Sequence, residues 1–412
     1  GRHPDRAMTE HGSPALAAGR RQLDTGGCPR LLRSLVTATC VATALPAAAQ
    51  QWQVRPNLSL GVDYDDNITL DPENPESGFG PTARAALRAE RSTENSALGL
   101  LGGLRLNAVR ENSDLSNIGA FLGGDGSYQT VRSQYRLNLS LSTQSTLTSE
   151  TATTGVRDTD GQQYQLEIRP GWSYRLSERS TLGVNASYRQ VFYDGVDDAA
   201  LSDYRSGNLA LSAGRQLTEV AGISAVVSYG RYQSQGDSTE SENLALQLGA
   251  DYQVSETLSV DALFGLRRTE VTFPGFFGRS VTEDSTGPTY SLSIQKRLAR
   301  GGGLSLRALR ELTPSGAAEV LDTTSLRLGY TYPINERLSL SLSSRAYRNR
   351  QPGGETGASD RTYADGGLAI TYQLRPAWRV GFNYRYRWQD READPSSAES
   401  NRIGISLAWS GR

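Results

Sequence analysis

Large apolar residues alternate with polar ones along most of this chain. In the stretch "RVGFNYRYRWQD", residues 379–390, the apolar or aromatic residues Val380, Phe382, Tyr384, Tyr386 and Trp388 occupy every second position. A period of two predicts a β-strand with one apolar and one polar face. The stretch is about twice as long as the usual strand of about 5–6 residues in a soluble protein. The apolar face therefore packs on a second sheet of a soluble β protein or faces lipid.

The same pattern recurs in about 18 segments, of which the second and fourth are the weakest, so that 16 strands are the alternative. The segments start near residues 53, 80, 95, 116, 134, 161, 180, 203, 221, 242, 257, 286, 302, 322, 336, 362, 377 and 399. Tight turns such as 176–180 and 333–337 alternate with longer polar stretches, which we expect at 65–79, 149–160, 191–202, 271–285 and 350–361. Short turns on one side and long loops on the other are typical of bacterial outer-membrane barrels.

Aromatic residues recur on one face at intervals that match a membrane. Trp378 and Trp388 are ten residues apart, as are Tyr164 and Tyr174. Ten strand residues at about 3.3 Å, tilted by roughly 40°, span about 25 Å, which is the height of the lipid-facing band. We therefore predict an all-β fold, a closed antiparallel transmembrane β-barrel. Its candidate lipid-interface aromatics are Tyr164, Trp172, Tyr174, Trp378, Trp388 and Trp409.

The first 49 residues have the features of a secretory leader. Arg30 and Arg33 precede an apolar run from residue 35 to 45, and "PAAA" at 46–49 predicts cleavage after Ala49. Residues 1–7 precede Met8, the only methionine, and are expected to lie upstream of the true start. The domain prediction is thus a leader at 1–49 and one barrel at 50–412. The even strand number places both termini in the periplasm of a bacterial cell.

The composition of residues 50–412 argues against most catalytic and nucleic-acid functions. Both cysteines and both histidines lie in the leader, so the usual thiolate, imidazole and metal-ligand chemistry is missing. The remaining 37 basic and 41 acidic side chains (43 − 6 and 44 − 3) nearly balance, which argues against a nucleic-acid partner. We expect no cofactor, no metal and no enzyme. A carboxylate-based glycan hydrolase is the remote alternative, with candidates Glu150, Glu167, Asp261, Asp390 and Glu392.

The polar face of the predicted barrel is rich in arginine. At about 18 strands the lumen holds water, and an arginine-rich wall favours anions. An alternative with equal weight is that these arginines only pair with carboxylates. Arg385 and Arg387 are expected to favour anions at the outer entrance, because their strand carries no acid at the flanking inward positions. The lumen-lining candidates are Arg84, Arg88, Arg105, Arg136, Arg169, Arg267, Arg307, Arg327, Arg345, Arg385, Arg387 and Arg402.

Short motifs resemble those of a known family. They are "LSLGVDYDDNI" at 58–68, "YRLSERSTL" at 174–182 and the looser "YQVSETLSV" at 252–260. With them the chain resembles the β-barrel porin 2 family. The resemblance implies an outer-membrane barrel associated with exopolysaccharide or capsule loci, without catalytic residues.

Two functions lead. The first is a porin-like channel for polar or anionic solutes, linked to exopolysaccharide export. The second is a non-conducting scaffold or loop-mediated partner of an envelope polysaccharide assembly. The expected partners are outer-membrane lipid and lipopolysaccharide, the barrel-assembly machinery and exopolysaccharide export components.

Overall fold

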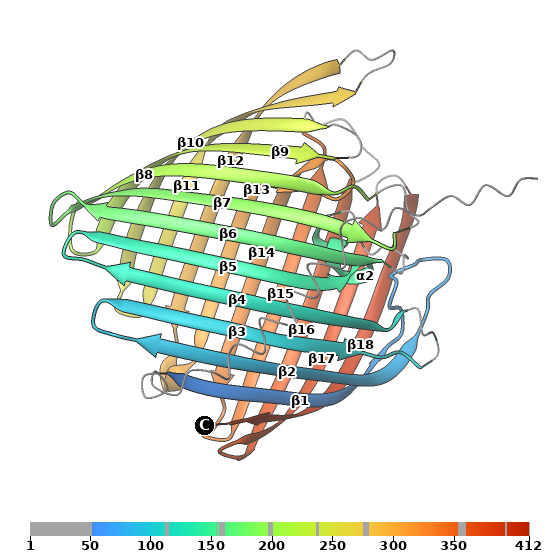
Figure 1. The fold of residues 1–412 in the computed structure, drawn as a ribbon. Coiled ribbons are helices and arrows are strands. Elements are labelled where there is room, and N and C mark those ends of the chain that lie inside the picture. Colours follow the sequence, from blue (N-terminus) through green and yellow to red (C-terminus); the bar gives the residue numbers. More distant parts are fainter. Residues whose placement is uncertain are drawn as a thin grey trace, which may run out of the picture. The chain divides into compact units, whose positions relative to one another are not determined.

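Eighteen antiparallel strands form one sheet that closes on itself (Figure 1). The computed structural model describes residues 52–110, 112, 115–153, 155, 161–196, 201–235, 239–274, 280–352, 360–391 and 394–411. The predicted leader at 1–49 lies outside these ranges. The strands are β1 (Gln53–Asp65), β2 (Gly78–Ser92), β3 (Ser96–Asn107), β4 (Asn117–Gln129), β5 (Ser133–Ser145), β6 (Gln162–Arg175), β7 (Ser180–Asp194), β8 (Tyr204–Gln216), β9 (Ala221–Ser234), β10 (Glu240–Ser255), β11 (Leu258–Pro274), β12 (Ser280–Arg297), β13 (Gly303–Pro314), β14 (Val320–Pro333), β15 (Leu338–Arg350), β16 (Arg361–Arg375), β17 (Trp378–Arg391) and β18 (Asp394–Ser410).

Each strand pairs with its neighbours in sequence, and the first strand closes the barrel by pairing with the last. The pairs of β1 and β18 run from Asn57 with Ser410 to Asp65 with Arg402. Closure matters because backbone N–H and C=O groups have no water to bond to inside a lipid layer. The number of strands is therefore 18, and the weak second and fourth segments of the sequence are full strands, β2 and β4.

The two ends of the barrel differ. Turns such as 93–95, 130–132 and 376–377 join strands at one end, which also holds the start of β1 and the end of β18. The 3-10 helix η5 (Ala299–Gly301) belongs to the turn between β12 and β13, where Gly301 has a positive φ of 80°. The other end carries the long loops, including 66–77 and 146–161. The second of these contains the helix α2 (Thr146–Ser149) and the 3-10 helix η3 (Glu150–Ala152). In Figure 1, α2 lies at the end of the barrel opposite the short turns.

The outer surface is apolar around the whole barrel. Leu60 on β1 and Leu248 on β10 are each 65% exposed, and Phe264 on β11 is 64% exposed. Exposed apolar side chains of this size on nearly every strand are costly in water, and a lipid environment removes that cost. The fold is therefore a closed antiparallel transmembrane β-barrel. No helix in the part of the chain that the structure describes is long and apolar enough to cross a membrane.

Two expected loops are partly strand. β11 runs to Pro274 and β12 starts at Ser280, so most of the predicted loop 271–285 is a paired hairpin. β7 likewise extends to Asp194, into the predicted loop 191–202. Beyond the lipid both faces of a strand meet water, so pairing continues while the apolar alternation stops. A prediction based on alternation therefore makes such strands too short.

Candidate functional site

The inner face is identified by contacts that cross the lumen. Asn349 on β15 donates from Nδ2 to the backbone carbonyl of Thr153, at 2.8 Å. Thr153 belongs to the loop between β5 and β6, and eight strands separate that hairpin from β15 and β16 on one side and six on the other. Odd-numbered residues of β15 therefore point inward. The cross-strand register extends this assignment around the barrel.

The register places all twelve arginines named from the sequence on the inner face. Six of them form an ion pair. The pairs are Arg88–Glu90 (2.5 Å), Arg169–Glu167 (2.7 Å), Arg267–Asp322 (2.6 Å), Arg345–Asp365 (2.7 Å), Arg387–Asp65 (2.7 Å) and Arg402–Asp63 (2.6 Å). The other six have no carboxylate within 4 Å among the described residues, and they are Arg84, Arg105, Arg136, Arg307, Arg327 and Arg385. The interpretation that inward arginines pair with carboxylates thus holds for six of the twelve, and anion preference from the other six stays a prediction.

Arg387 was expected to be an unpaired charge at the outer entrance, but it is paired. Its guanidinium donates to Asp65 at 2.7 Å, to the carbonyl of Asn67 at 3.0 Å and to the hydroxyl of Ser400 at 2.8 Å. The expected free charge at the entrance is therefore wrong for Arg387, whereas Arg385 has no such partner among the described residues. The acid that neutralises Arg387 comes from β1, two strands away, and inspection of its own strand could not reveal it.

One register row of inward residues crosses the wall from β10 to β18. Its members, each paired across strands with the next, are Asp251, Asp261, Ser293, Arg307, Arg327, Arg345, Asp365, Arg387 and Ser400. Asp261 lies near the short-turn end of β11, whereas Arg387 lies near the long-loop end of β17. The row therefore climbs the wall and carries neighbouring arginines on β13, β14 and β15.

Arg84 and Arg105 form a second set of adjacent arginines. They are cross-strand partners on β2 and β3, and both guanidinium carbons lie over the ring of Phe121, at 5.1 and 5.0 Å from its centroid. The negative face of an aromatic ring attracts such cations. Phe121 thus offsets part of the repulsion between the two charges while leaving both guanidinium groups cationic. Its inward position follows from the register and was not predicted.

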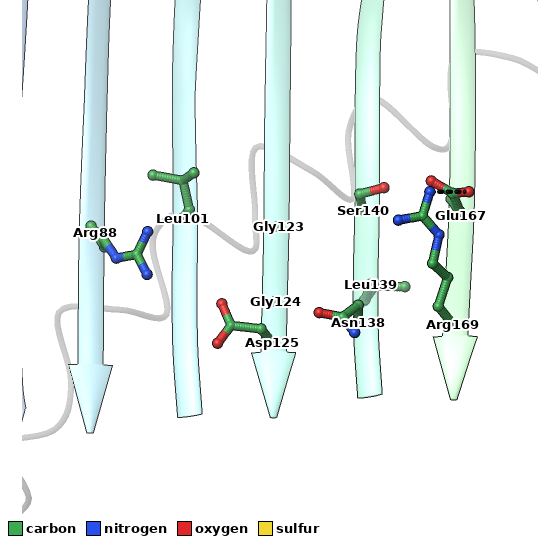
Figure 2. A pocket seen from close by; sticks show the side chains of 10 residues that line it. All are labelled: Arg88, Leu101, Gly123, Gly124, Asp125, Asn138, Leu139, Ser140, Glu167 and Arg169. Carbon is green, nitrogen blue, oxygen red and sulfur yellow. Dashed lines mark hydrogen bonds and ion pairs between the residues drawn. The ribbon is translucent and has the colours of Figure 1, made fainter. Parts of the chain in front are cut away.

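A cleft of about 220 Å³ lies in the wall between β2 and β6 (Figure 2). Gly123 and Gly124 line it on β4, between Arg88 on one side and Glu167 with Arg169 on the other. Asp125 and Asn138 lie opposite each other in the register and close the lower edge in Figure 2. The cleft is small and mixed in charge, so it suits a small polar solute better than a bulky one.

The loop between β5 and β6 crosses the lumen. Glu150, 2% exposed, accepts hydrogen bonds from Tyr193 (2.5 Å), Gln163 (2.7 Å) and Thr153 (2.5 Å). On the far wall, the Tyr347 hydroxyl and the Arg361 guanidinium both donate to the carbonyl of Thr151. Hydrogen bonds at both walls hold this segment across the barrel at the long-loop end, where it narrows the lumen.

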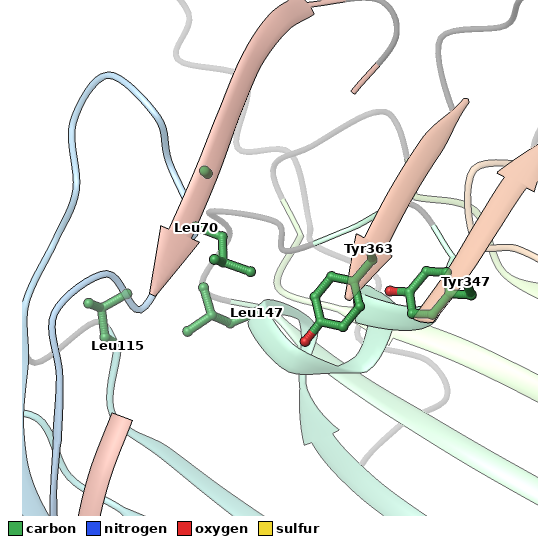
Figure 3. Close-up of a cluster of buried hydrophobic side chains, with 6 residues drawn as sticks. Leu70, Leu115, Leu147, Tyr347 and Tyr363 are labelled. Carbon is green, nitrogen blue, oxygen red and sulfur yellow. The ribbon is translucent and has the colours of Figure 1, made fainter. Parts of the chain in front are cut away.

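Three long loops meet in a small apolar cluster beside this crossing. Leu70, Leu115 and Leu147 come from the loops after β1, β3 and β5, and they pack near Tyr347 and Tyr363 of the wall (Figure 3). The rings of Tyr347 and Tyr363 stack at 4.9 Å, and the guanidinium carbon of Arg361 lies 5.4 Å and 5.7 Å from their centroids. The long-loop end of the lumen is therefore packed, whereas the wall below it is polar.

The acidic loop after β1 belongs to the same structure. Asn67 donates from Nδ2 to the carbonyl of Glu399 at 3.1 Å, and Gln389 donates to the carbonyl of Leu70 at 2.7 Å. The backbone N–H groups of Asn74 and Glu73 donate to Asp71 and lower the pKa of its carboxyl. Asp63 and Asp65 at the top of β1 neutralise Arg402 and Arg387.

The aromatic residues named from the sequence lie on the outer face. Trp378 and Trp409 are cross-strand partners near the short turns, and Trp172 and Tyr174 lie near the same end with ring centroids 5.9 Å apart. Trp388 and Tyr164 lie toward the long-loop ends of β17 and β6. The two groups are thus at opposite ends of the strands. Their place at the lipid interface stays a prediction.

The carboxylates of the hydrolase alternative are scattered. Glu150 lies in the crossing loop, Glu167 is bound to Arg169 and Arg189 on the wall, and Asp261 lies on β11. Asp390 lies at the long-loop end of β17, and Glu392 lies outside the described residues. Within the described ranges, no group of three or more acidic side chains is arranged to hold a metal ion.

The fold, the polar lumen and the apolar exterior define the class of transmembrane β-barrels. No family model matches the chain, and no curated protein matches it either. The membership of the β-barrel porin 2 family therefore stays a prediction from the motifs.

Three outer-membrane proteins are among the solved structures to which the chain is similar. The channel DcaP of Acinetobacter baumannii is 14% identical with a TM-score of 0.42, covering 87% of this chain and 97% of that one. The protein opdK from Pseudomonas aeruginosa is 13% identical with a TM-score of 0.45, covering 87% and 99%. A BenF-like porin from Pseudomonas fluorescens Pf-5 is 12% identical with a TM-score of 0.46, covering 87% and 99%.

Proposed function

We propose that this protein is an outer-membrane channel of the porin-like class, which passes small polar solutes and prefers anions. The observation that carries the proposal is the set of inward arginines with no carboxylate within 4 Å among the described residues, above all Arg307 and Arg327 on adjacent strands. Glu311 interacts electrostatically with both of them from a longer distance, so two positive charges face one negative charge there. Arginine keeps its charge at any physiological pH. A wall with unpaired arginines raises the local concentration of anions in a water-filled lumen.

The crossing loop supports passage of small solutes only. The segment from Leu147 to Thr153 is held at both walls, and it divides the lumen at the long-loop end. A channel with such a constriction admits ions and small metabolites while excluding polymers. Direct passage of exopolysaccharide is therefore disfavoured, and a link to its export would concern precursors, fragments or partner proteins.

The location follows from the same proposal. The export leader predicted from the sequence, and the position of the short turns and both ends of the barrel on one side, fit insertion from the periplasm of a bacterial cell, with lipopolysaccharide around the long-loop end. The barrel-assembly machinery would insert the chain. None of this chemistry requires an enzyme or a cofactor.

A scaffold function is the second candidate, and the cluster of Leu70, Leu115 and Leu147 favours it. If the packed loops close the lumen, the protein conducts nothing and its long-loop end serves as a binding surface for envelope components.

Planar-bilayer recordings of the purified protein test both candidates. We expect single-channel steps and, under a salt gradient, a reversal potential that shows anion preference. The preference should decrease at 1 M salt, where the Debye length falls to about 3 Å. The double variant Arg307→Glu/Arg327→Glu should shift selectivity toward cations, whereas Arg268→Glu, at an outward arginine of β11, should not. Absence of steps with folded protein supports the scaffold, and a cation-selective wild type contradicts the anion preference.

A further inference from the structure

The lower part of the register row separates acids from bases over a short distance. Asp251 and Asp261 are direct cross-strand partners on β10 and β11, and Arg307 and Arg327 are direct partners on β13 and β14. Ser293 on β12 pairs with Asp261 on one side and with Arg307 on the other. Two carboxylates, one hydroxyl and two guanidinium groups therefore follow each other across five neighbouring strands.

None of the four charged side chains has a hydrogen bond or an ion pair within 4 Å among the described residues, and all four are exposed. Glu311, on the same inward face of β13, interacts electrostatically with Arg307 and Arg327 without forming such an ion pair. Like charges placed directly opposite each other on one face of a sheet destabilise it. An arrangement such as Asp261 beside Arg327 would have paired the charges, as Arg345 is paired with Asp365 at 2.7 Å. Without a direct ion pair among the described residues, the hydrogen-bonding groups of both signs remain available to a solute.

The distance between the two signs selects the solute. Neighbouring strands lie about 4.8 Å apart, so β11 and β13 are separated by about 9.5 Å. A solute with a single charge is attracted by the residues of opposite charge and repelled by the residues of like charge in the same row. A solute with an ammonium group at one end and a carboxylate at the other is attracted at both ends. Two extended residues of a peptide span about 7 Å, and the length of the Arg307 side chain covers the rest.

We propose that this row is a binding site for zwitterionic solutes with separated charges, of which short peptides are the chemical class. The ammonium group binds at Asp261, with Asp251 beside it, and the carboxylate binds at Arg307, with Arg327 beside it. The Ser293 hydroxyl lies between and bonds to the polar middle of the solute. The inference rests on the proposed channel, and it names a substrate class for the lumen.

Three closely related probes that differ in their terminal charges test the site. Glycylglycine carries both charges, N-acetylglycylglycine keeps only the carboxylate, and glycylglycine amide keeps only the ammonium group. The half-saturating concentration for block of the ion current is measured in planar bilayers for each probe. In the wild type we expect the half-saturating concentration of glycylglycine to be roughly fivefold lower than that of either singly charged probe. The difference is modest because each exposed charge contact contributes little.

Single substitutions assign the two ends. Asp261→Asn should raise the half-saturating concentration of glycylglycine and of the amide by roughly fivefold, and it should not raise that of the acetylated probe. Arg307→Gln should raise the half-saturating concentrations of glycylglycine and of the acetylated probe. Glu270→Gln is the matched control, because it removes one carboxylate from the same strand, β11, on its outward face, where Glu270 lies opposite Glu242. The inference fails if glycylglycine blocks no better than the two singly charged probes, or if Glu270→Gln acts like Asp261→Asn.

The readout distinguishes this inference from the channel proposal. Ion conductance without a preference for the zwitterion removes the peptide site and leaves the channel. If the wild type passes no current, the channel proposal fails. Line broadening of the probes' proton resonances with the protein in detergent micelles then tests the site by itself, with the same order of probes expected.

Discussion

At the scale of single residues, a side chain's face decides what a substitution does. Phe382 on β17 is 37% exposed and pairs with Ile370 and Ile405 on the outer surface. Asn383, the next residue, points into the lumen opposite Gly404. Neighbouring residues of one strand therefore meet hydrocarbon and water.

Phe382→Arg should reduce the stability of the folded barrel by about 2–4 kcal/mol, because a charge near the middle of the bilayer is costly. Asn383→Arg should have a much smaller effect, since the lumen already holds arginines and water. Urea titrations in lipid vesicles, followed by tryptophan fluorescence, measure both. Equal losses from the two variants would show that the face assignment is wrong.

The two entrance arginines should respond differently to charge reversal. Arg385→Glu removes a free positive charge, so the reversal potential should move toward cation preference while the barrel stays intact. Arg387→Glu places a carboxylate against Asp65, whose ion pair with Arg387 is 2.7 Å long and largely buried. It should instead loosen the loop after β1, which limited proteolysis would detect as faster cleavage. Identical behaviour of the two variants would contradict the assigned pairing.

At the scale of elements, the crossing loop is the part of the fold that sets the lumen's width. Its helix α2 is only one turn long, and isolated helices of this length are unstable. Its position depends on contacts with both walls, namely those of Glu150 on one side and those of Tyr347, Asn349 and Arg361 on the other.

Weakening the far-wall contacts should therefore widen the channel. In the double variant Tyr347→Phe/Asn349→Ala, two donors to the loop backbone are lost, so we expect a larger mean single-channel conductance and more current noise. Asn208→Ala, which removes an inward amide on β8 without a described partner, is the control. An unchanged conductance would mean that the narrowest point of the lumen lies elsewhere.

At the scale of the whole molecule, closure by β1 and β18 makes the barrel one cooperative unit. No edge strand is left for detergent to open, because both edges of the sheet are paired. Unheated protein in dodecyl sulfate should therefore migrate faster than boiled protein, and the chain should fractionate with outer membranes. Recovery in the soluble periplasm, or identical migration in both states, would contradict a closed membrane barrel.

The alternation of residues was sufficient to predict the barrel. A strand between lipid and water has one apolar and one polar face. This alternation is visible in the sequence of the strand itself, without knowledge of any tertiary contact. For this reason most strand starts and the faces of Phe382 and Arg385 could be predicted locally, and so could the tight turns, whereas β12 and β18 begin five or six residues before their predicted starts. Where a strand leaves the lipid, as β11 and β12 do, the pattern ends and the prediction of its length was wrong.

Only the tertiary structure decided which inward charges remain free and what crosses the lumen. Arg387 meets Asp65 because closure of the barrel brings β1 within two strands of β17, and Arg345 meets Asp365 because of the register between the consecutive strands β15 and β16. The same register brings Asp251 beside Asp261 and Arg307 beside Arg327. The segment from Leu147 to Thr153 is an ordinary polar loop in sequence, and its fold across the barrel depends on wall residues nearly two hundred positions away. Sequence periodicity specifies faces because it is a local property of one strand, whereas register and loop packing depend on contacts between different strands.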